Sequence, residues 1–214
     1  MKNIHNGFTL VEVLVSIVII GVVASLTIPV IKKDSIKEEN VAGLKKAYST
    51  LSHVTNMIIE NEGRANPAYG GWATSTANIY NKYKKYTINA KECGTKGKDC
   101  FAQKYTLLNN QTVTSGSRYT FVMTDGVQVS FPNTNTDFSN NCSLNAAGSR
   151  NVCQLILVDV NGNKKPNKVG KDIFSLSLKS TGLYPSGCES KRCSTKNDGY
   201  GCACKVLREG AINY

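Results

Sequence analysis

The chain has 214 residues, of which 41% are hydrophobic, so it has room for one soluble domain and one additional apolar segment. Its 26 lysines and arginines against 15 acidic residues give a formal net charge of +11, which favours anionic partners such as nucleic acid, anionic lipid or acidic polysaccharide. The sequence argues against an enzyme, because it holds only two histidines and no Ser/His/Asp set, metalloprotease helix or phosphate-binding loop.

The apolar residues are concentrated near the N-terminus. The run FTLVEVLVSIVIIGVVASLTIPVI covers residues 8–31, and Glu12 is its only charged residue. A helix of this length rises about 36 Å, enough to cross a hydrocarbon core of about 30 Å. The rest of the chain is polar and rich in Asn, Ser, Thr, Gly and Lys. This asymmetry predicts a membrane anchor followed by an exported head.

Three interpretations of residues 1–31 compete. An ordinary secretory signal would be cut near Ala24, but its apolar stretch would begin only after Gly7 and would contain a carboxylate. An uncut anchor leaves Glu12 unexplained, because an unpaired charge in the hydrocarbon region is costly. The third interpretation rests on a family resemblance that accounts for both features.

The segment MKNIHNG-FTLVEVLVSIVIIGVVASLTIP resembles the N-terminal signal of type IV pilins and of the pseudopilins of type II secretion. In that family a prepilin peptidase cuts after a glycine, matched by Gly7, and the new N-terminal residue, matched by Phe8, becomes N-methylated. Glu12 matches the family's acidic residue, and Pro29 matches a proline near the end of the apolar run. The resemblance implies a filament in which Glu12 neutralises the amine of Phe8 in a neighbouring subunit.

Residues 32–62 are predicted to continue the helix. Apolar residues recur there at gaps of three to five and form one face: Ile36, Val41, Leu44, Tyr48, Leu51, Val54 and Ile58. Ser35 and Glu38 fit a capping box but are equally compatible with one long helix, and Gly63 marks the helix end. The predicted organisation is a leader at 1–7, a transmembrane and polymerisation helix at 8–31, an amphipathic helix at 32–62 and a globular head at 63–214.

Aromatic residues mark the segment 64–118, with Trp72 as a predicted core anchor and Ile79, Tyr83 and Tyr86 on a predicted short helix. The alternative is a stacking surface for nucleic acid. In that interpretation the aromatic residues alternate with the densest group of lysines, Lys82, Lys84 and Lys85.

Strands are predicted in the second half of the chain. Residues 119–124 and 127–131 flank Asp125-Gly126, which is a strong hairpin signal, and residues 152–160 and 174–178 predict two more strands. A helix followed by antiparallel strands, without βαβ alternation, is an α+β pattern. It agrees with the pilin-like fold that the resemblance implies, in which a long helix packs on a sheet of about four strands.

Oxygen-bearing side chains gather between the last two predicted strands. Asp159, Asn161 and Asn163 alternate and Asp172 follows, a set that suits a hard cation such as calcium. The segment is not an EF-hand, because Gly162 stands fourth rather than sixth and no glutamate ends the loop. The resemblance adds weight, since pseudopilins often hold calcium in a loop between strands. The alternative is an Asn-Gly turn with side-chain-to-backbone hydrogen bonds, and three neighbouring lysines weaken the cation site.

Eight cysteines lie beyond residue 90, namely Cys93, Cys100, Cys142, Cys153, Cys188, Cys193, Cys202 and Cys204. An even number in an exported domain predicts disulfides. Zinc held by the last four is the alternative, but zinc ligands usually stand two to four residues apart, and His5 and His53 are distant in sequence.

The spacing of the cysteines suggests their pairing. Cys93 with Cys100 and Cys142 with Cys153 close short loops. Cys202 and Cys204 alternate along a predicted strand, so they point the same way and are expected to reach back to Cys188 and Cys193.

These features predict a structural subunit of a type IV pilus or of a type II secretion pseudopilus. The eight cysteines and a leader processed on the cytoplasmic face place the head outside the inner membrane, although Lys32 and Lys33 run against the positive-inside rule. The head would then lie in a periplasmic or extracellular filament. Expected partners are prepilin peptidase, other copies and minor pilins, and the inner-membrane assembly platform. The alternatives are a DNA-uptake pilin that binds nucleic acid and a membrane-anchored binding module.

Overall fold

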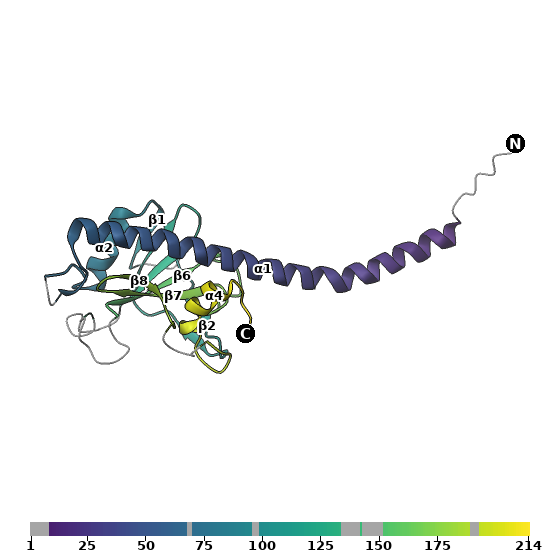
Figure 1. Ribbon diagram of the computed structural model, residues 1–214. Helices are drawn as coiled ribbons and strands as arrows, with labels where there is room; N and C mark the ends of the chain where they lie inside the picture. Colours follow the sequence, from purple (N-terminus) through teal and green to yellow (C-terminus); the bar gives the residue numbers. More distant parts are fainter. Residues whose placement is uncertain (1–8, 68–69, 96–98, 134–141, 143–151, 189–192) are drawn as a thin grey trace. The chain divides into compact units, whose positions relative to one another are not determined.

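The structure is a computed structural model that describes residues 9–67, 70–95, 99–133, 142, 152–188 and 193–214, with residues 29–33 described by their backbone alone. The chain divides into two compact units, Met1–Glu38 and Glu39–Tyr214. The long helix α1, Leu10–Glu62, belongs to both units and contains 53 residues (Figure 1). It is helical through Pro29 and Ser35, so Ser35 and Glu38 do not begin a new helix.

The second unit contains a six-stranded sheet in the order β1-β4-β5-β6-β7-β8 and a separate two-stranded sheet, β2-β3. Every pair of neighbouring strands is antiparallel. The strands are β1 (Asn89–Gly94), β2 (Lys104–Thr106), β3 (Thr112–Thr114), β4 (Arg118–Met123), β5 (Gln128–Pro132), β6 (Gln154–Asp159), β7 (Ile173–Lys179) and β8 (Gly182–Pro185). Among the described residues, the other helices of this unit are α2 (Thr76–Tyr86), the 3₁₀ turn Tyr200–Cys202 and α4 (Ala203–Glu209).

The α+β fold is confirmed, but the expected sheet of about four strands is too small. The predicted strands correspond to β4, β5, β6 and β7, and the predicted Asp-Gly hairpin joins β4 to β5, where Phe121 pairs with Val129. Strands β1 and β8 complete the two edges of the large sheet and were not predicted from the sequence. Neither segment has a sequence pattern typical of a strand. The residues of β1 are polar and largely exposed, and β8 is a short segment with Gly and Pro at its ends.

The two faces of the large sheet are covered differently. On one face, alternate strand residues such as Phe121, Ile156 and Phe174 join the main core with the buried stripe of α1, which includes Leu44 and Leu51. Figure 1 shows this part of α1 lying along the sheet. Burying each such large apolar side chain stabilises the fold by about 1.5–3 kcal/mol. The amphipathic stripe predicted for residues 32–62 therefore packs on the sheet from Val41 onward.

The opposite face of the sheet carries a smaller apolar cluster and several polar residues. Leu157 and Ile173 pack there with Phe101, Tyr105 and other residues near the β2-β3 hairpin. Strand residues that alternate with the main core include the buried Gln128, Asp159 and Ser175.

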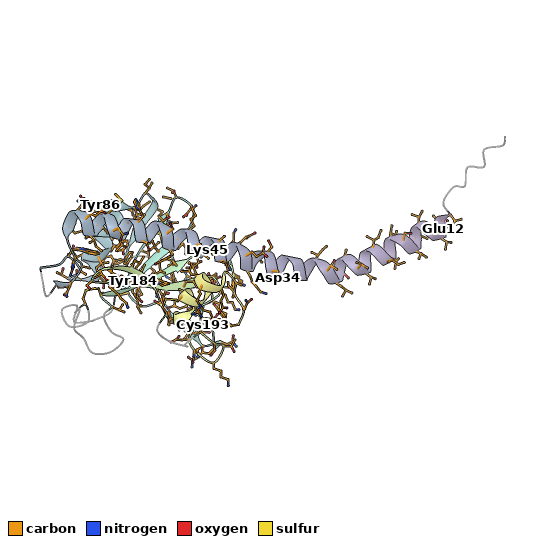
Figure 2. All side chains as sticks on the ribbon, viewed as in Figure 1. Glu12, Asp34, Lys45, Tyr86, Tyr184 and Cys193 are labelled. Carbon is orange, nitrogen blue, oxygen red and sulfur yellow. A yellow bond between two sulfur atoms is a disulfide. The ribbon has the colours of Figure 1, made fainter. Side chains whose placement is uncertain are left out.

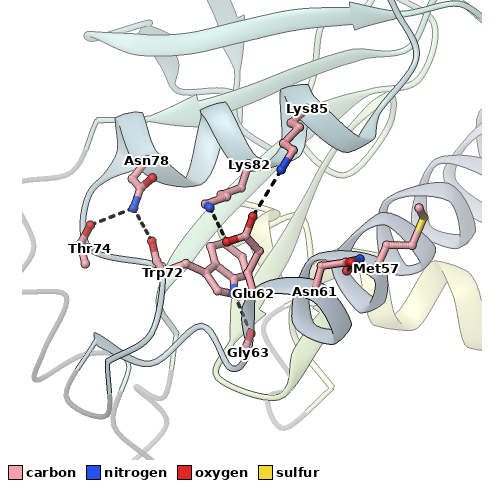
Figure 3. A network of polar contacts seen from close by, with 9 residues as sticks. All are labelled: Met57, Asn61, Glu62, Gly63, Trp72, Thr74, Asn78, Lys82 and Lys85. Carbon is pink, nitrogen blue, oxygen red and sulfur yellow. Dashed lines mark hydrogen bonds and ion pairs between the residues drawn. The ribbon is translucent and has the colours of Figure 1, made fainter.

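Helix α1 ends where the sequence predicts. Gly63 adopts a left-handed conformation with φ of 82°, which favours glycine. Its carbonyl accepts a hydrogen bond of 2.9 Å from Trp72 Nε1, and Glu62 forms ion pairs with Lys82 (2.7 Å) and Lys85 (3.6 Å) of α2 (Figure 3). These contacts tie the end of α1 to α2.

Gly43 allows α1 to approach the segment that follows β6. A Cβ atom at Gly43 would lie 3.0 Å from Cβ of Val160, closer than most side-chain contacts. The helix therefore lies directly against the connection between β6 and β7 at this point.

Tyr83 of α2 forms a buried hydrogen bond to α1. Its hydroxyl lies 2.6 Å from Thr55 Oγ1, and both residues have no exposed surface. Because the Thr55 hydroxyl donates its proton to the carbonyl of Leu51 at 2.7 Å, the Tyr83 hydroxyl must donate to Thr55. Burial raises the pKa of the Tyr83 phenol, which keeps that proton in place.

We expect Tyr83→Phe to lower the free energy of unfolding by about 1 kcal/mol, because it deletes one buried donor. Urea unfolding of the full chain in non-ionic detergent would measure this loss. The half-buried Tyr119, which packs on the same core, offers the matched control Tyr119→Phe. An equal loss in both variants would argue against a special contribution of the Thr55 contact.

Candidate functional site

The first part of α1 is an exposed apolar surface. Leu10–Ile28 is long and apolar enough to cross a membrane, with a mean hydropathy of 2.6, and none of it is buried. Its large apolar side chains lie on all sides of the helix, with exposed fractions from 48% at Val13 to 77% at Leu10 (Figure 2). A helix that is apolar all round is suited to lipid or to other apolar helices, unlike a surface helix with a single stripe.

Glu12 lies in the first turn of this helix and closes a capping box with Thr9. The Thr9 amide donates to Glu12 Oε2 at 2.8 Å, and the Glu12 amide donates to Thr9 Oγ1 at 3.2 Å. The Thr9 hydroxyl also donates to Glu12 Oε2 at 2.8 Å. These bonds satisfy backbone groups that a helix start otherwise leaves unpaired. The carboxylate is thus held beside the first residues of the helix.

The other residues proposed for processing and assembly are only partly described. Gly7 and Phe8 lie outside the described residues. Pro29 lies within α1, where its backbone is helical.

Comparison with protein families identifies this N-terminal segment. Residues 2–28 match the family model of the prokaryotic N-terminal methylation motif. The N-terminus is that of a prepilin-type protein. This motif is the signature of type IV pilins and pseudopilins, and it implies processing by prepilin peptidase and assembly with other pilin subunits. Neither the comparison with curated proteins nor that with solved structures gave a match.

The architecture of the chain agrees with the motif. A long apolar N-terminal helix, an antiparallel sheet and disulfides are the features expected of a pilin-like fold. The motif and the apolar span Leu10–Ile28 together indicate membrane anchoring.

The densest group of lysines in the head is neutralised by acidic neighbours. Lys82 and Lys85 pair with Glu62, and Lys84 pairs with Glu92 at 2.9 Å. The Glu92 carboxylate holds the pKa of Lys84 above its usual value. The phenol of Tyr86, and then the Glu62 carboxylate, raise the pKa of Lys85. These lysines therefore do not form an unpaired patch for phosphate groups.

The aromatic residues near these lysines belong to the core. Trp72 is 6% exposed and Tyr83 is fully buried, and both join the main core cluster. The prediction of Trp72 as a core anchor is confirmed. The alternative of a stacking surface at these two residues is wrong, because a nucleic-acid base could not reach their rings.

All eight cysteines form disulfides, and the pairs agree with those that spacing suggested. They are Cys93–Cys100, Cys142–Cys153, Cys188–Cys204 and Cys193–Cys202. The last four cysteines cannot bind zinc as thiolates, because each of their sulfur atoms is bonded to another sulfur.

One reason given for these pairs is wrong. Cys202 ends the 3₁₀ turn and Cys204 lies in α4, so neither is on a strand. Side chains two residues apart on a helix differ in direction by about 200° around its axis. The sulfurs of Cys202 and Cys204 therefore point in different directions and reach separate partners. Helix α4 ends at Glu209 and is capped by Gly210. The φ of Gly210 is 66°, and its amide donates to the carbonyl of Val206 at 2.8 Å.

The predicted cation ligands lie at the connection between β6 and β7. Asp159 ends β6, Asp172 immediately precedes β7, and both are fully buried. The Asp172 carboxylate accepts hydrogen bonds from the amides of Asn167 (2.7 Å) and Lys168 (2.6 Å) and from Asn161 Nδ2 (3.3 Å). The Asp172 carboxylate therefore stabilises the conformation of the segment between β6 and β7 through these hydrogen bonds.

Asp159 is less well satisfied than Asp172. Its Oδ1 accepts the amide of Asn161 at 3.2 Å, but its buried Oδ2 has no hydrogen-bond partner. Burial, and then the nearby carboxylate of Asp172, raise the pKa of Asp159 to about 8. Burial also raises the pKa of Asp172, although the backbone amides oppose this shift. Leaving such a group unpaired costs about 1–3 kcal/mol or more when it is charged.

The lysines near this connection do not neutralise the two aspartates. Within the described residues, neither Asp159 nor Asp172 forms an ion pair. The Lys168 amine instead donates to Asn110 Oδ1 at 2.6 Å, and the Lys171 amine donates to the carbonyl of Tyr214. The objection that lysines weaken a cation site is therefore smaller than the sequence suggests.

The oxygen cluster differs in membership from the predicted set. Asn163 is exposed, and its Oδ1 accepts a hydrogen bond of 3.0 Å from Gln128 Nε2. Three other side-chain oxygens at this connection are buried without a partner, those of Gln128, Asn161 and Asn167. Gln128 and Asn167 are not among the residues predicted from the sequence. Asn167 stands in the same polar segment and could have been included on composition, whereas Gln128 required knowledge of how β5 and β6 pair.

Within the described part of the chain, no group of three or more acidic, histidine or cysteine side chains is placed so that it could hold a metal ion. A cation at the β6-β7 connection would therefore depend on carboxamide oxygens in addition to the two aspartates.

Proposed function

We propose that this protein is a structural subunit of an envelope-spanning filament, either a type IV pilus or a type II secretion pseudopilus. Prepilin peptidase would cut between Gly7 and Phe8, Phe8 would be methylated, and the chain would polymerise through α1. The observation that carries the proposal is the match of residues 2–28 to the N-terminal methylation motif.

The exposed surface of α1 supports polymerisation. Thirteen large apolar side chains between Leu10 and Ile28 are exposed, and they need an apolar environment. The membrane provides it for the single subunit, and α1 helices of neighbouring subunits provide it in a filament. Pro29 lacks a backbone N–H and so weakens the helix at the end of this span, which would let the helix adapt during packing.

The domain organisation and location follow from this proposal. A leader (1–7) is removed, residues 8–31 anchor the subunit and then polymerise, residues 32–62 continue the helix, and residues 63–214 form the head. The head lies outside the inner membrane, because disulfides persist in oxidising compartments. The partners are other copies, minor pilins and the inner-membrane assembly platform.

Processing at Gly7 gives the most direct test. We expect N-terminal sequencing and mass spectrometry of the mature protein to begin at N-methylated Phe8. In Gly7→Leu the chain should keep Met1, because the glycine after which the peptidase cuts in this family is replaced. A mature protein that starts at Met1, or at Ser25 as a secretory signal would give, would contradict the proposal.

A further inference from the structure

Two pairs of adjacent like charges stand exposed on the chain without a counter-charge. Lys164 and Lys165 lie in the segment between β6 and β7, and Glu38 and Glu39 lie on α1. All four side chains are exposed, and none of them forms an ion pair with another described residue.

Other adjacent lysines of the head have partners. Lys46 pairs with Asp125 at 3.0 Å, and Lys84 and Lys85 pair with acidic residues as described above. The carboxylates closest in sequence to Lys164 and Lys165 are those of Asp159 and Asp172, which are fully buried and form no ion pair within the described residues. The lysine pair is therefore uncompensated positive charge on the surface of the head.

The glutamate pair faces away from the core of its own chain. Asn40 and Val41 are only 4% and 5% exposed, and each stands two residues after one of the glutamates. Because side chains two residues apart on a helix differ in direction by about 200°, Glu38 and Glu39 lie on the opposite side of α1 from these buried residues. This outward helix face has no partner among the described residues of the single chain.

The two charged pairs lie at a similar level along α1. A Cβ atom at Gly43 would lie 3.0 Å from Cβ of Val160, so the segment that carries the lysines begins beside this turn of the helix. Glu39 stands about one helical turn before Gly43. Lys164 stands four residues after Val160, which limits their separation to about 14 Å. Two subunits side by side would thus bring lysines of one chain near glutamates of the next.

We propose that the lysine pair Lys164-Lys165 of one subunit docks on the glutamate pair Glu38-Glu39 of a second copy of this chain, an inference that rests on the proposed filament. Different surfaces of the two copies meet, and such heterologous contacts build open helical filaments. Every copy carries both pairs, so each subunit within the filament forms the contact twice, once through its lysines and once through its glutamates.

Charge complementarity favours a second copy as the occupant. Two adjacent positive charges match two adjacent negative charges in number and spacing, and both are present in every subunit. A nucleic acid would account for the lysines alone, and a cationic partner protein would account for the glutamates alone. Exposed ion pairs contribute more to specificity than to affinity, so this contact determines which faces of neighbouring subunits meet, while the apolar surface of α1 provides most of the association.

Carbodiimide cross-linking of purified wild-type filaments tests the contact directly. The reagent joins a neighbouring amine and carboxylate through an amide bond, with no spacer between them. Mass spectrometry should find a peptide that links Lys164 or Lys165 to Glu38 or Glu39. This peptide should occur in the cross-linked dimer on a denaturing gel, and not in the monomer or in detergent-solubilised subunits.

Charge reversal tests the same contact in cells that also express wild type. Lys164→Glu combined with Lys165→Glu places like charges on both sides. Because one exposed ion pair changes an equilibrium by up to about fivefold, losing two pairs and adding repulsion should lower incorporation into filaments by about tenfold or more. Glu38→Lys combined with Glu39→Lys should have the same effect. The variant with all four substitutions should form filaments when it is the only subunit, because its contacts are complementary again, and should not mix with wild type.

Lys104→Glu combined with Lys196→Glu is the matched control, because it changes the net charge equally. Both lysines are exposed and form no ion pair with a described residue. This variant should incorporate like wild type. All variants change exposed positions, so their Tm in non-ionic detergent should stay within about 2 °C of wild type. The cross-linking uses the wild-type chain, so it decides even if a variant does not fold.

Three results would overturn the proposal. They are wild-type filaments whose cross-linked dimers lack a link between the two pairs, normal incorporation of the double lysine variant, and failure of the folded four-substitution variant to form filaments. A double lysine variant that loses DNA binding but incorporates normally would assign the lysines to nucleic acid instead. A wild-type chain that keeps Met1 and forms no filament would refute the proposed function together with this contact, whereas filaments without the cross-link would refute only the contact.

Discussion

Glu12→Leu should reduce incorporation of the subunit into filaments by about 100-fold or more. The proposed assembly buries the Phe8 amine against a neighbour's Glu12, and removing one partner of a buried ion pair costs about 3–5 kcal/mol. Cleavage and membrane insertion should be unchanged, because leucine extends the apolar surface of Leu10–Ile28. The measurement is quantitative mass spectrometry of sheared filaments from cells that express the variant beside wild type.

The capping box at Thr9 provides the internal comparison for this experiment. Glu12→Leu also removes the hydrogen bonds to Thr9, but such a cap is worth only about 1 kcal/mol. Thr9→Val keeps the carboxylate and removes the hydroxyl, so its incorporation should fall by less than tenfold. Ser16→Ala, which removes only a bond of 2.7 Å to the carbonyl of Glu12, should incorporate normally. Wild-type incorporation of Glu12→Leu would refute the assembly role.

Gly187→Ala should lower the free energy of unfolding by about 3 kcal/mol or more. A Cβ atom at position 187 would lie 1.9 Å from the carbonyl oxygen of Gly201, and the φ of 93° is strained for any other residue. The two segments cannot separate, because the Cys188–Cys204 disulfide and a hydrogen bond of 3.1 Å from the Cys204 amide to the Ser186 carbonyl hold them together.

Urea unfolding of the oxidised chain would measure this effect. Gly116→Ala is the control, because an added Cβ there meets no atom within 4 Å. It should change the free energy of unfolding by less than about 0.5 kcal/mol. Equal stability of the two variants would show that the segments at Gly187 and Gly201 have room to move.

The elements with a strong local signal could be predicted from the sequence. Helix α1 follows from its apolar run and stripe and ends at Gly63, and the β4-β5 hairpin follows from Asp125-Gly126. Strands β1 and β8 could not be predicted in the same way. They are edge strands whose pairing with β4 and β7 depends on backbone hydrogen bonds, which any sequence can form.

The processing motif and the oxygen cluster also differ in how far they could be predicted from the sequence. The processing and assembly motif is contiguous, so its residues can be recognised without a fold. The oxygen cluster brings together residues that are distant in sequence, and Gln128 joins it only through the pairing of β5 with β6. Asn163 has the right spacing but lies beyond the turn, where it is exposed. Residues at alternate positions share one face of a sheet only while the strand continues. Because β6 ends at Asp159, this rule does not apply to Asn163.

Helix α1 passes from the first unit into the core of the second without an intervening loop. In the proposed filament, a pulling force would therefore be carried along the hydrogen bonds of this helix. The helical turn at Pro29 lacks one backbone hydrogen bond and is mechanically the weakest, so it should extend first under load. The head, in which four disulfides close covalent loops, would keep its fold while the fibre lengthens.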